Sequence, residues 1–280
     1  MQFKDKFLDL STPKVMGILN VTPDSFSDGG AFNLLEKGLA QTDLMLSEGA
    51  DIIDIGGEST RPGAVAVSVQ QELDRVIPMI ESIYQRFDTI ISIDTSKAKV
   101  MTEAVNAGAN LINDVRALQE DGALSAAANA GVPICLMHMQ GQPRVMQQNP
   151  SYDDVVKDVI AFLQSRISVC FKAGIAEEQI IIDPGFGFGK SLEHNYQMLA
   201  NMEEFHKLNV PILAGMSRKS MIGNLLQRDI QQRLAGNIAA ATVAAQKGAQ
   251  IIRVHDVKET VDAVKIINMI NAYRNNNNER

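Results

Sequence analysis

Polar side chains follow each of the short apolar runs that recur along the chain, and their chemistry falls into two classes. Carboxylates and amides can pair with the donor and acceptor edge of a polar ring, whereas cations can bind an anion. A single polar residue in such a place is usually a helix cap or part of a loop salt bridge. The same pattern after every run favours a site for a ligand with both a ring and an anionic part. The residues are Asn20, Asp54, Asp94, Asn113, His138, Asp183, Ser217, Arg218, Lys219, Arg253 and His255.

The apolar runs themselves have the composition of parallel strands that are covered on both faces. They occupy residues 15–19, 52–55, 90–93, 111–112, 133–137, 180–182, 211–214 and 251–254. Helical patterns separate them, most clearly at 69–87, where apolar residues recur every three or four positions. Strand and helix alternating in this way along 280 residues predict an α/β fold, a single-domain (β/α)8 TIM barrel.

A weak internal repeat supports the barrel and places the polar residues within it. Segments 49–54, 108–113 and 248–253 each start with Gly, contain a polar turn residue followed by two aliphatic residues, and end on a polar residue. The Gly suits the left-handed position that ends a helix. The polar residue then lies at the carboxyl end of the following strand, which is the end of such barrels that carries the active site.

Two connections and one glycine-rich segment stand out among the loops. Residues 21–32 and 56–68 make long connections after the first and second strands, and we expect them to act as lids. GFGFGK at 185–190 lacks the spacing of a nucleotide-binding P-loop. Its glycines allow a tight turn, and Phe186 and Phe188 could form walls for a flat ligand.

Composition excludes several classes of partner. The chain has 26 Lys and Arg against 33 Asp and Glu, a net charge of −7, and no block of basic residues, so we expect neither a nucleic-acid nor an anionic-membrane partner. No stretch of about 18 apolar residues and no signal-peptide core occurs. Its 2 Cys do not form a disulfide framework or a metal-binding spacing, which fits a cytoplasmic protein.

Domain boundaries are also suggested by the sequence. The barrel core is expected at about 15–271, within one domain that covers 1–280. A short N-terminal lead precedes the core. The Asn-rich residues 274–280 are expected to be a disordered tail.

Six longer motifs resemble those of the dihydropteroate synthases, a family of pterin-binding TIM barrels. The resemblance covers about 15–264 and is specific because several long motifs occur in order. They are GILNVTPDSFSDGG at 17–30, DIGGESTRPGA at 54–64, ISIDTSK at 91–97, DPGFGFGK at 183–190, GMSRKS at 215–220 and RVHDV at 253–257.

The resemblance implies a transferase of folate biosynthesis. The reaction would join (7,8-dihydropterin-6-yl)methyl diphosphate and 4-aminobenzoate, giving 7,8-dihydropteroate and diphosphate by way of a pterin cation. It also implies Mg²⁺, a homodimer, and a place among the targets of sulfonamides.

Roles for individual residues follow from the same resemblance. Catalytic roles fall on Asp94, Asp183 and Lys219. Pterin binding is assigned to Asp94, Asn113, Asp183, Lys219, Met137 and Gly215. Diphosphate binding is assigned to Asn20, Thr60, Arg61, Arg253 and His255, with Asn20 also the ligand of Mg²⁺. Aminobenzoate binding is assigned to Phe26, Pro62, Phe188, Ser217 and Lys219.

Several alternatives remain at this stage. A pterin-dependent methyltransferase of the same barrel family would share the ring-binding half of the site, and a regulatory pterin-binding module would lack catalysis. His138 could be a structural histidine, and Lys97 either a helix N-terminal charge or a ligand. Asp54 and Glu58 could orient loops, and Arg218 could be a solvated or subunit-facing charge.

Overall fold

The apolar runs of the sequence form one closed parallel sheet in the computed structural model, which describes residues 1–22, 31–59, 66–141 and 150–278. Within these residues, eight strands pair in the order β8-β7-β6-β5-β4-β3-β10-β9. A parallel bridge between Ile182 and Ile212 joins the two ends of this order and closes the barrel. The strands are β3 (Lys14–Asn20), β4 (Ile52–Gly56), β5 (Ile90–Asp94), β6 (Leu111–Asp114), β7 (Ile134–Met137), β8 (Ile180–Asp183), β9 (Leu213–Ala214) and β10 (Ile251–Val254).

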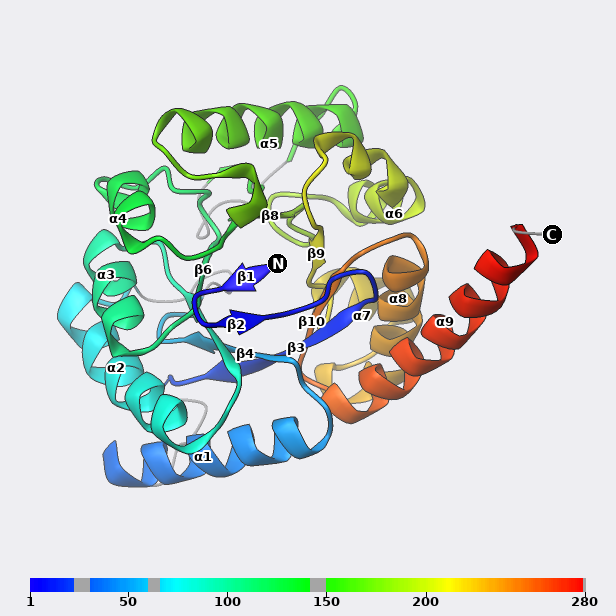
Figure 1. The fold of residues 1–280 in the computed structure, drawn as a ribbon. Coiled ribbons are helices and arrows are strands. Elements are labelled where there is room, and N and C mark those ends of the chain that lie inside the picture. The colour runs from blue at the N-terminus through cyan, green and yellow to red at the C-terminus, as the bar shows by residue number, and fades with distance from the viewer. Residues whose placement is uncertain (23–30, 60–65, 142–149, 279–280) are drawn as a thin grey trace.

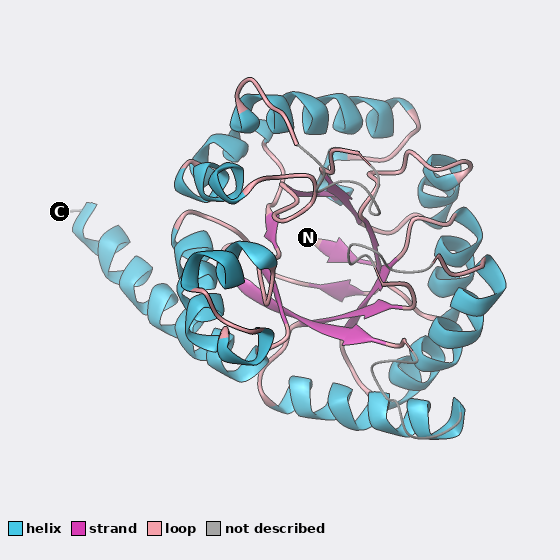
Figure 2. Ribbon diagram, turned by 180° about the vertical axis from the view of Figure 1, so that it is seen from behind, coloured by secondary structure: helices cyan, strands magenta, loops and turns pink. Residues whose placement is uncertain are grey.

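Helices surround the barrel and cover the outer face of its strands (Figures 1 and 2). This confirms the predicted TIM barrel and its alternation of strand and helix. The α-helices are α1 (Ala31–Ser47), α2 (Val69–Arg86), α3 (Ala98–Ala107), α4 (Ala123–Ala130), α5 (Val155–Lys172), α6 (Leu192–Ala200), α7 (Ser220–Leu226), α8 (Leu234–Gln246) and α9 (Val257–Asn278). The short 3₁₀ helices are η2 (Glu177–Gln179), η3 (Met202–Leu208) and η4 (Ile230–Gln232).

Local sequence signals set the ends of several helices. Ser68 caps α2 by accepting a hydrogen bond from the backbone N–H of Gln71, whose side chain accepts from the Ser68 N–H in return. The glycines of the internal repeat have positive φ, 100° at Gly49, 125° at Gly108 and 93° at Gly248. Because side chains other than hydrogen disfavour this conformation, the repeat marks where a helix gives way to the next strand.

The amino-terminal end of the barrel is closed by a feature that the sequence did not indicate. Residues expected to form only a short lead build a two-stranded antiparallel hairpin, β1 (Gln2–Phe3) and β2 (Lys6–Phe7). The hairpin lies across the barrel end (Figure 1). Phe3 is 0% exposed and packs in a cluster with residues at or near the start of each strand, which are Met16, Ile52, Ile90, Leu111, Cys135, Ile181, Leu213 and Ile251.

The carboxyl-terminal helix is longer than expected. We predicted a disordered tail from residue 274, whereas α9 extends to Asn278 and projects from the body of the barrel (Figures 1 and 2). No Pro or Gly follows Val257, so the two strongest helix-breaking residues are absent from the segment that forms α9. No helix among the described residues is long and apolar enough to cross a membrane.

The two connections predicted to be long are long in the structure. β3 ends at Asn20 and α1 begins at Ala31, while β4 ends at Gly56 and α2 begins at Val69. Their central residues, 23–30 and 60–65, lie outside the described ranges. The lid function of these connections therefore stays a prediction.

Candidate functional site

The carboxyl ends of the strands bring the predicted polar residues to one rim of the barrel. Asp94 is the partner of Gly56 in the β4–β5 register and of Asn113 in the β5–β6 register. Asn20 pairs with Gly56 from the other side. Parallel strands that all end at this rim thus place residues from distant parts of the chain next to each other.

Arg253 joins two carboxylates at this rim. Its Nε donates to Asp54 Oδ2 at 2.6 Å, and its Nη2 donates to Asp94 Oδ2 at 2.9 Å. Asn113 Nδ2 donates to the same Asp54 oxygen at 3.4 Å. Asp54 is 0% exposed, so its contact with Arg253 is shielded from solvent. Asp54 therefore contacts two other residues of the rim, Arg253 and Asn113, through one oxygen.

Burial and charge shift the ionisation of this cluster. Burial raises the pKa of Asp94 to about 7, because the attraction of Arg253 offsets it only in part and Asp54 adds repulsion. Burial by itself would lower the pKa of Arg253, but the carboxylates of Asp54 and Asp94 outweigh burial and raise it. The rim therefore holds a fixed cation beside a carboxyl group that titrates near neutral pH.

Asp183 and Lys219 form a second part of the rim, next to the glycine-rich turn. Asp183 Oδ1 accepts a hydrogen bond from the Gly185 N–H at 2.7 Å. Lys219 Nζ donates to the carbonyl of Phe186 at 2.6 Å and lies 4.5 Å from the centroid of the Phe188 ring. Burial raises the pKa of Asp183, and burial lowers the pKa of Lys219 to about 8, although each attracts the charge of the other. Their charges therefore face each other across a partly desolvated space.

Gly215 connects the two parts of the rim. A β-carbon at this position would lie 3.7 Å from Arg253 Cβ and 3.9 Å from Asp183 Oδ2. The absence of a side chain at Gly215 thus leaves space between the two charged groups. Asp94, Asn113, Asp183, Lys219, Gly215 and Arg253, predicted to converge, are brought together.

An apolar wall borders the charged groups. Met137 and Phe188, both predicted for the site, pack with Val115, and Met139 lies against them. The sequence did not single out Val115 or Met139. They follow directly on the strands β6 and β7, and position alone could have suggested them. The wall gives the rim a face on which a flat ring can lie.

Ser217 and His255 contact each other beside this rim. Ser217 Oγ accepts from the His255 backbone N–H at 3.2 Å and lies 3.1 Å from His255 Nδ1. The neighbouring Arg218 was interpreted as a solvated or subunit-facing charge. Its side chain is 37% exposed, and its Nη2 also pairs with Asp256 Oδ1 at 2.5 Å. This ion pair ties the loop after β9 to the loop after β10.

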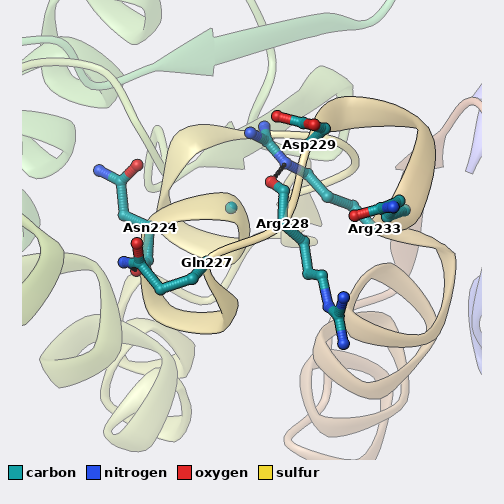
Figure 3. Close-up of a pocket in the computed structure, with 7 residues that line it drawn as sticks. Asn224, Gln227, Arg228, Asp229 and Arg233 are labelled. Atoms are coloured by element: carbon teal, nitrogen blue, oxygen red, sulfur yellow. Dashed lines mark hydrogen bonds between the residues drawn. The ribbon is translucent and has the colours of Figure 1, made fainter.

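Arg233 bonds to the backbone of the loop after β9, which contains Arg218. Its Nη1 donates to the carbonyl of Arg218 at 2.8 Å, and its Nε donates to that of Arg228 at 3.0 Å. Arg233 also lines a surface pocket of about 300 Å³ between α7 and η4 (Figure 3). The pocket is lined by Gly223, Asn224, Gln227, Arg228, Asp229, Gln232 and Arg233, none of which we predicted for the site.

Lys97 belongs to a separate cluster between the second and third strands. Its Nζ pairs with Glu58 Oε2 at 2.5 Å and with Glu72, which is buried. Glu58 Oε1 also accepts from the Val67 N–H at 3.1 Å, which joins the two ends of the β4–α2 connection. Burial lowers the pKa of Lys97, but its bonds to the two glutamates outweigh this and raise it. Lys97 is thus bound by two protein carboxylates. The sequence did not predict Glu72 as a partner, because this residue lies on the buried, mainly apolar face of α2.

A buried lysine in the glycine-rich segment was also missed. Lys190 is 3% exposed, and its Nζ lies 2.9 Å from Nδ1 of His138. Burial lowers the pKa of His138 to about 3, with a further contribution from Lys190. His138 is therefore a neutral partner of a buried lysine, in line with the structural alternative considered for it.

Four predicted residues cannot be placed. Phe26, Thr60, Arg61 and Pro62 lie outside the described residues. Arg253, which the resemblance assigned to the diphosphate, lies against Asp54 and Asp94, so the rim does not separate into an acidic half and a basic half.

Comparisons with known proteins agree with this geometry. Residues 16–255 match the family described as pterin binding enzyme. The chain is 58% identical over 260 residues to the dihydropteroate synthase of Escherichia coli K12, covering 93% of this chain and 92% of the relative. It is 59% identical over 262 residues to that of Haemophilus influenzae, covering 94% and 95%.

Solved structures are similar over nearly the whole chain. A Yersinia pestis dihydropteroate synthase in a sulfonamide drug complex has a TM-score of 0.93 at 59% identity, covering 97% of this chain and 99% of the other. A Xanthomonas albilineans dihydropteroate synthase with 4-aminobenzoic acid has a TM-score of 0.90 at 52% identity, covering 95% of each chain.

Proposed function

The chain belongs to the pterin-binding enzyme family and, within it, to the dihydropteroate synthases, and from this premise we propose how its rim residues perform the reaction. The reaction condenses (7,8-dihydropterin-6-yl)methyl diphosphate with 4-aminobenzoate to give 7,8-dihydropteroate and diphosphate. The observation that carries the proposal is the convergence of Asp94, Asp183, Lys219 and Arg253 beside one apolar wall.

The carboxylates and the amide at the rim suit the polar edge of a pterin. Its exocyclic amino group and ring N–H are donors that Asp183 can accept, and Asn113 can bond in both directions. Lys219 would donate to the ring acceptors, and Asp94 would face the dihydropyrazine side. The ring would lie against Met137 and over Gly215, where no side chain intervenes. A pocket that matches so many polar groups discriminates against analogues that lack them.

Charge development in the transition state explains the need for buried carboxylates. The bond between the methylene carbon and the bridging oxygen breaks, and its electron pair leaves with diphosphate. The positive charge that remains on the pterin would be stabilised by Asp94 and Asp183 in their ionised forms. The amino nitrogen of aminobenzoate then forms the C–N bond and releases a proton. No covalent bond to the protein is needed.

Cationic and hydroxyl side chains would bind the two anionic groups of the substrates, the diphosphate and the carboxylate of aminobenzoate. Arg253 and His255 would bind the diphosphate, together with Thr60 and Arg61. Ser217 and Lys219, with Phe26, Pro62 and Phe188, would bind aminobenzoate. Because a sulfonamide resembles aminobenzoate in shape and charge, we expect sulfonamides to compete at the same place, as the complex of the Yersinia pestis relative suggests.

Oxygen donors at the rim fit the Mg²⁺ that we propose as a cofactor. Asn20 Oδ1 lies 3.7 Å and Asp94 Oδ2 4.0 Å from the place that a β-carbon of Gly56 would take, so Gly56 leaves room between two oxygens. Among the described residues no group of three or more His, Cys, Asp or Glu side chains could hold a metal ion. Asn20 together with oxygens of the diphosphate is therefore the ligand set we favour, since Mg²⁺ in such sites has few protein ligands. When bound, Mg²⁺ would neutralise charge on the leaving group.

A coupled assay tests this function directly. Incubation with pterin diphosphate, 4-aminobenzoate and Mg²⁺ should release diphosphate and form dihydropteroate in equal amounts. Omission of either organic substrate, or addition of EDTA, should stop the reaction. Diphosphate release that does not need aminobenzoate would indicate hydrolysis and contradict the synthase assignment.

We also propose that the protein is a homodimer that works in the cytoplasm. Leu225, Leu226, Ile230 and Leu234 are 53%, 44%, 41% and 42% exposed on α7, η4 and α8, which is an apolar surface suited to a second copy of the chain. The buried, unpaired Cys135 and Cys170 fit a reducing compartment.

The oligomeric state can be measured with a matched control. Light scattering of the intact protein should give the mass of two chains, and Leu226→Glu with Leu234→Glu should give that of one. Phe171→Glu, which changes a residue 68% exposed on α5, should leave the mass unchanged. A monomeric intact protein would contradict the dimer.

The methyltransferase alternative requires no diphosphate. It loses support because the relatives described above are dihydropteroate synthases at 58% and 59% identity over almost the whole chain. Methyl transfer from methyltetrahydrofolate is therefore not expected.

A further inference from the structure

Two lysines contact the glycine-rich turn at residues 185–189. Lys219 contacts the carbonyl of Phe186 and the ring of Phe188. Lys190 contacts the carbonyls of Gly185 and Phe188 and is 3% exposed. The proposed reaction uses Lys219 but leaves Lys190, a buried ionisable group, without a role.

Lys190 bonds to both ends of the turn at once. Its Nζ donates to the carbonyl of Gly185 at 2.9 Å and to that of Phe188 at 3.0 Å, and it lies 2.9 Å from Nδ1 of His138. The carbonyl of His138 is a fourth, longer partner at 3.4 Å, so all three N–H groups of an ammonium are engaged. Because the two carbonyls come from opposite ends of the turn, one side chain sets the distance between these ends.

The turn has one backbone hydrogen bond of its own, from the Phe188 N–H to the Gly185 carbonyl at 3.2 Å, but its glycines leave the backbone few steric limits. Gly185, Gly187 and Gly189 have φ of 73°, 80° and 63°, a region that favours glycine. A β-carbon on Gly185 would overlap the carbonyl of His138, and one on Gly189 would overlap that of Gln140. Three flexible residues are therefore unavoidable here, and bonds from outside the turn must restrict them.

Two other side chains each bond to the turn at one residue. Gly187 N–H donates to Asn195 Oδ1 at 2.6 Å, and Tyr152 Oη donates to the carbonyl of Gly189 at 2.7 Å. Lys190 links Gly185 and Phe188 through their carbonyls, in addition to the backbone bond between these two residues, and so restrains the segment that carries the contacts to Lys219. Burial of Lys190 also lowers its pKa, which is a cost that the bonds to the turn must offset.

We propose that Lys190 is a positioning residue for the active site, which holds the 185–189 turn so that Phe186 and Phe188 fix the ammonium group of Lys219. This inference rests on the proposed function, in which Lys219 contacts the pterin and aminobenzoate. It predicts that Lys190 affects catalysis through Lys219 and not through general stability.

A double-mutant cycle separates these two possibilities. Lys190→Met keeps the length of the side chain and removes the charge, and it should lower kcat/KM for pterin diphosphate about 10- to 100-fold through misplacement of Lys219. In a Lys219→Met background, the same change should cost less than about threefold, because coupled residues are not additive. Equal losses in both backgrounds would overturn the proposal and leave Lys190 a structural residue.

Chemical rescue gives a second measurement, the recovery of kcat/KM, which a general loss of stability would not produce. Lys190→Ala leaves a space that ethylammonium can enter, and we expect added ethylammonium, but not ethanol, to recover part of kcat/KM. Met79→Ala, a buried change on α2 away from the turn, serves as the matched control for loss of packing and should not respond to either additive. Equal recovery with ethanol would contradict a role for the charge.

Hydrogen exchange tests the inference without enzyme activity. Exchange of the backbone N–H groups in 185–189 should be faster in Lys190→Met than in the unchanged protein, while exchange in β5 stays the same. Should the unchanged protein form no dihydropteroate, the proposed function fails, and this arm still decides whether Lys190 holds the turn. Unaltered exchange in the turn would refute the inference. Should Lys190→Met not fold, Lys190→Gln, which keeps a polar end but is too short to bond both the Gly185 and Phe188 carbonyls, should raise the same exchange.

Discussion

The two ends of the barrel use the same eight strands for opposite purposes. Near the amino-terminal end the strands carry buried apolar residues, and Phe3 of the hairpin packs against them. At or near their carboxyl-terminal ends, five of these strands carry Asp54, Asp94, Asn113, Asp183 and Arg253. The amino-terminal end is stabilised by packing of apolar side chains, whereas the buried charges at the carboxyl-terminal end need partners of opposite charge. We therefore expect changes at the first end to affect stability alone, and changes at the second to affect both stability and activity.

Arg253→Met should have the largest effect, because it acts on both properties. It leaves Asp54 and Asp94 without their cation, and breaking a buried pair in this way costs about 3 to 5 kcal/mol of unfolding free energy. Binding of pterin diphosphate should weaken far more than binding of the free pterin. Urea denaturation and calorimetry measure the two losses. Equal weakening for both ligands would contradict a diphosphate site at Arg253.

Phe3→Ala tests the opposite end. Removal of this fully buried ring from the apolar cluster should cost about 3 to 5 kcal/mol of unfolding free energy. kcat and KM measured well below the unfolding temperature should not change, because the rim lies at the other end of the strands. A change in KM comparable to that of a rim variant would mean that the two ends are not independent.

Asp183→Asn sharpens the comparison within the rim. The amide keeps the shape of the carboxylate but replaces one acceptor by a donor, so the pterin edge loses a partner. We expect pterin binding to weaken by about 1 to 3 kcal/mol in calorimetry, with a smaller change in unfolding free energy. Unchanged pterin affinity would remove Asp183 from the binding site.

The pH dependence should also distinguish the rim, since titratable groups there have shifted pKa values. Asp94, with a pKa of about 7, must be ionised to stabilise a pterin cation, and Lys219, with a pKa of about 8, must be protonated to donate. kcat/KM should therefore rise with pH through about 7 and fall above about 8. Lys219→Arg should remove the alkaline fall, because Arg stays protonated.

The ionisation of Asp94 should lower the stability of the fold as the pH rises, whereas it raises kcat/KM over the same pH range. The folded pKa is raised above its ordinary value, so the folded state binds the proton more tightly than the unfolded state does. This contribution is complete below the unfolded pKa and is lost as the pH rises through about 7. Urea denaturation from pH 4 to 8 should show a smaller decline for Asp94→Asn, and an identical decline would contradict the shift.

Lys6→Gln should have the smallest effect. Lys6 pairs with Asp88, but the Asp88 side chain is 94% exposed, so solvent screens the pair. The thermal unfolding midpoint should not move measurably, in contrast to Phe3→Ala in the same hairpin. A shift as large as that of Phe3→Ala would show that the hairpin is held by charge and not by packing.

The sequence predicted the repeated elements well. The apolar runs became the barrel strands, and Gly49, Gly108 and Gly248 took the positive φ expected of residues that end helices. These features are local, because hydrophobic periodicity and backbone preference depend on neighbouring residues. The hairpin was not predicted, because strands of two residues are too short to show an alternating pattern. The role of Lys190 was not predicted, because the glycine-rich segment was interpreted from its glycines and phenylalanines.

Local sequence therefore determined which residues would lie at the strand ends, and the family motifs indicated the reaction. Only the tertiary structure decided which of them contact each other. Arg253 and Asp54 are separated by 199 positions, and Lys190 and His138 by 52. The physical reason is that charge pairing and burial depend on distance in space, which barrel closure sets and which no local pattern encodes.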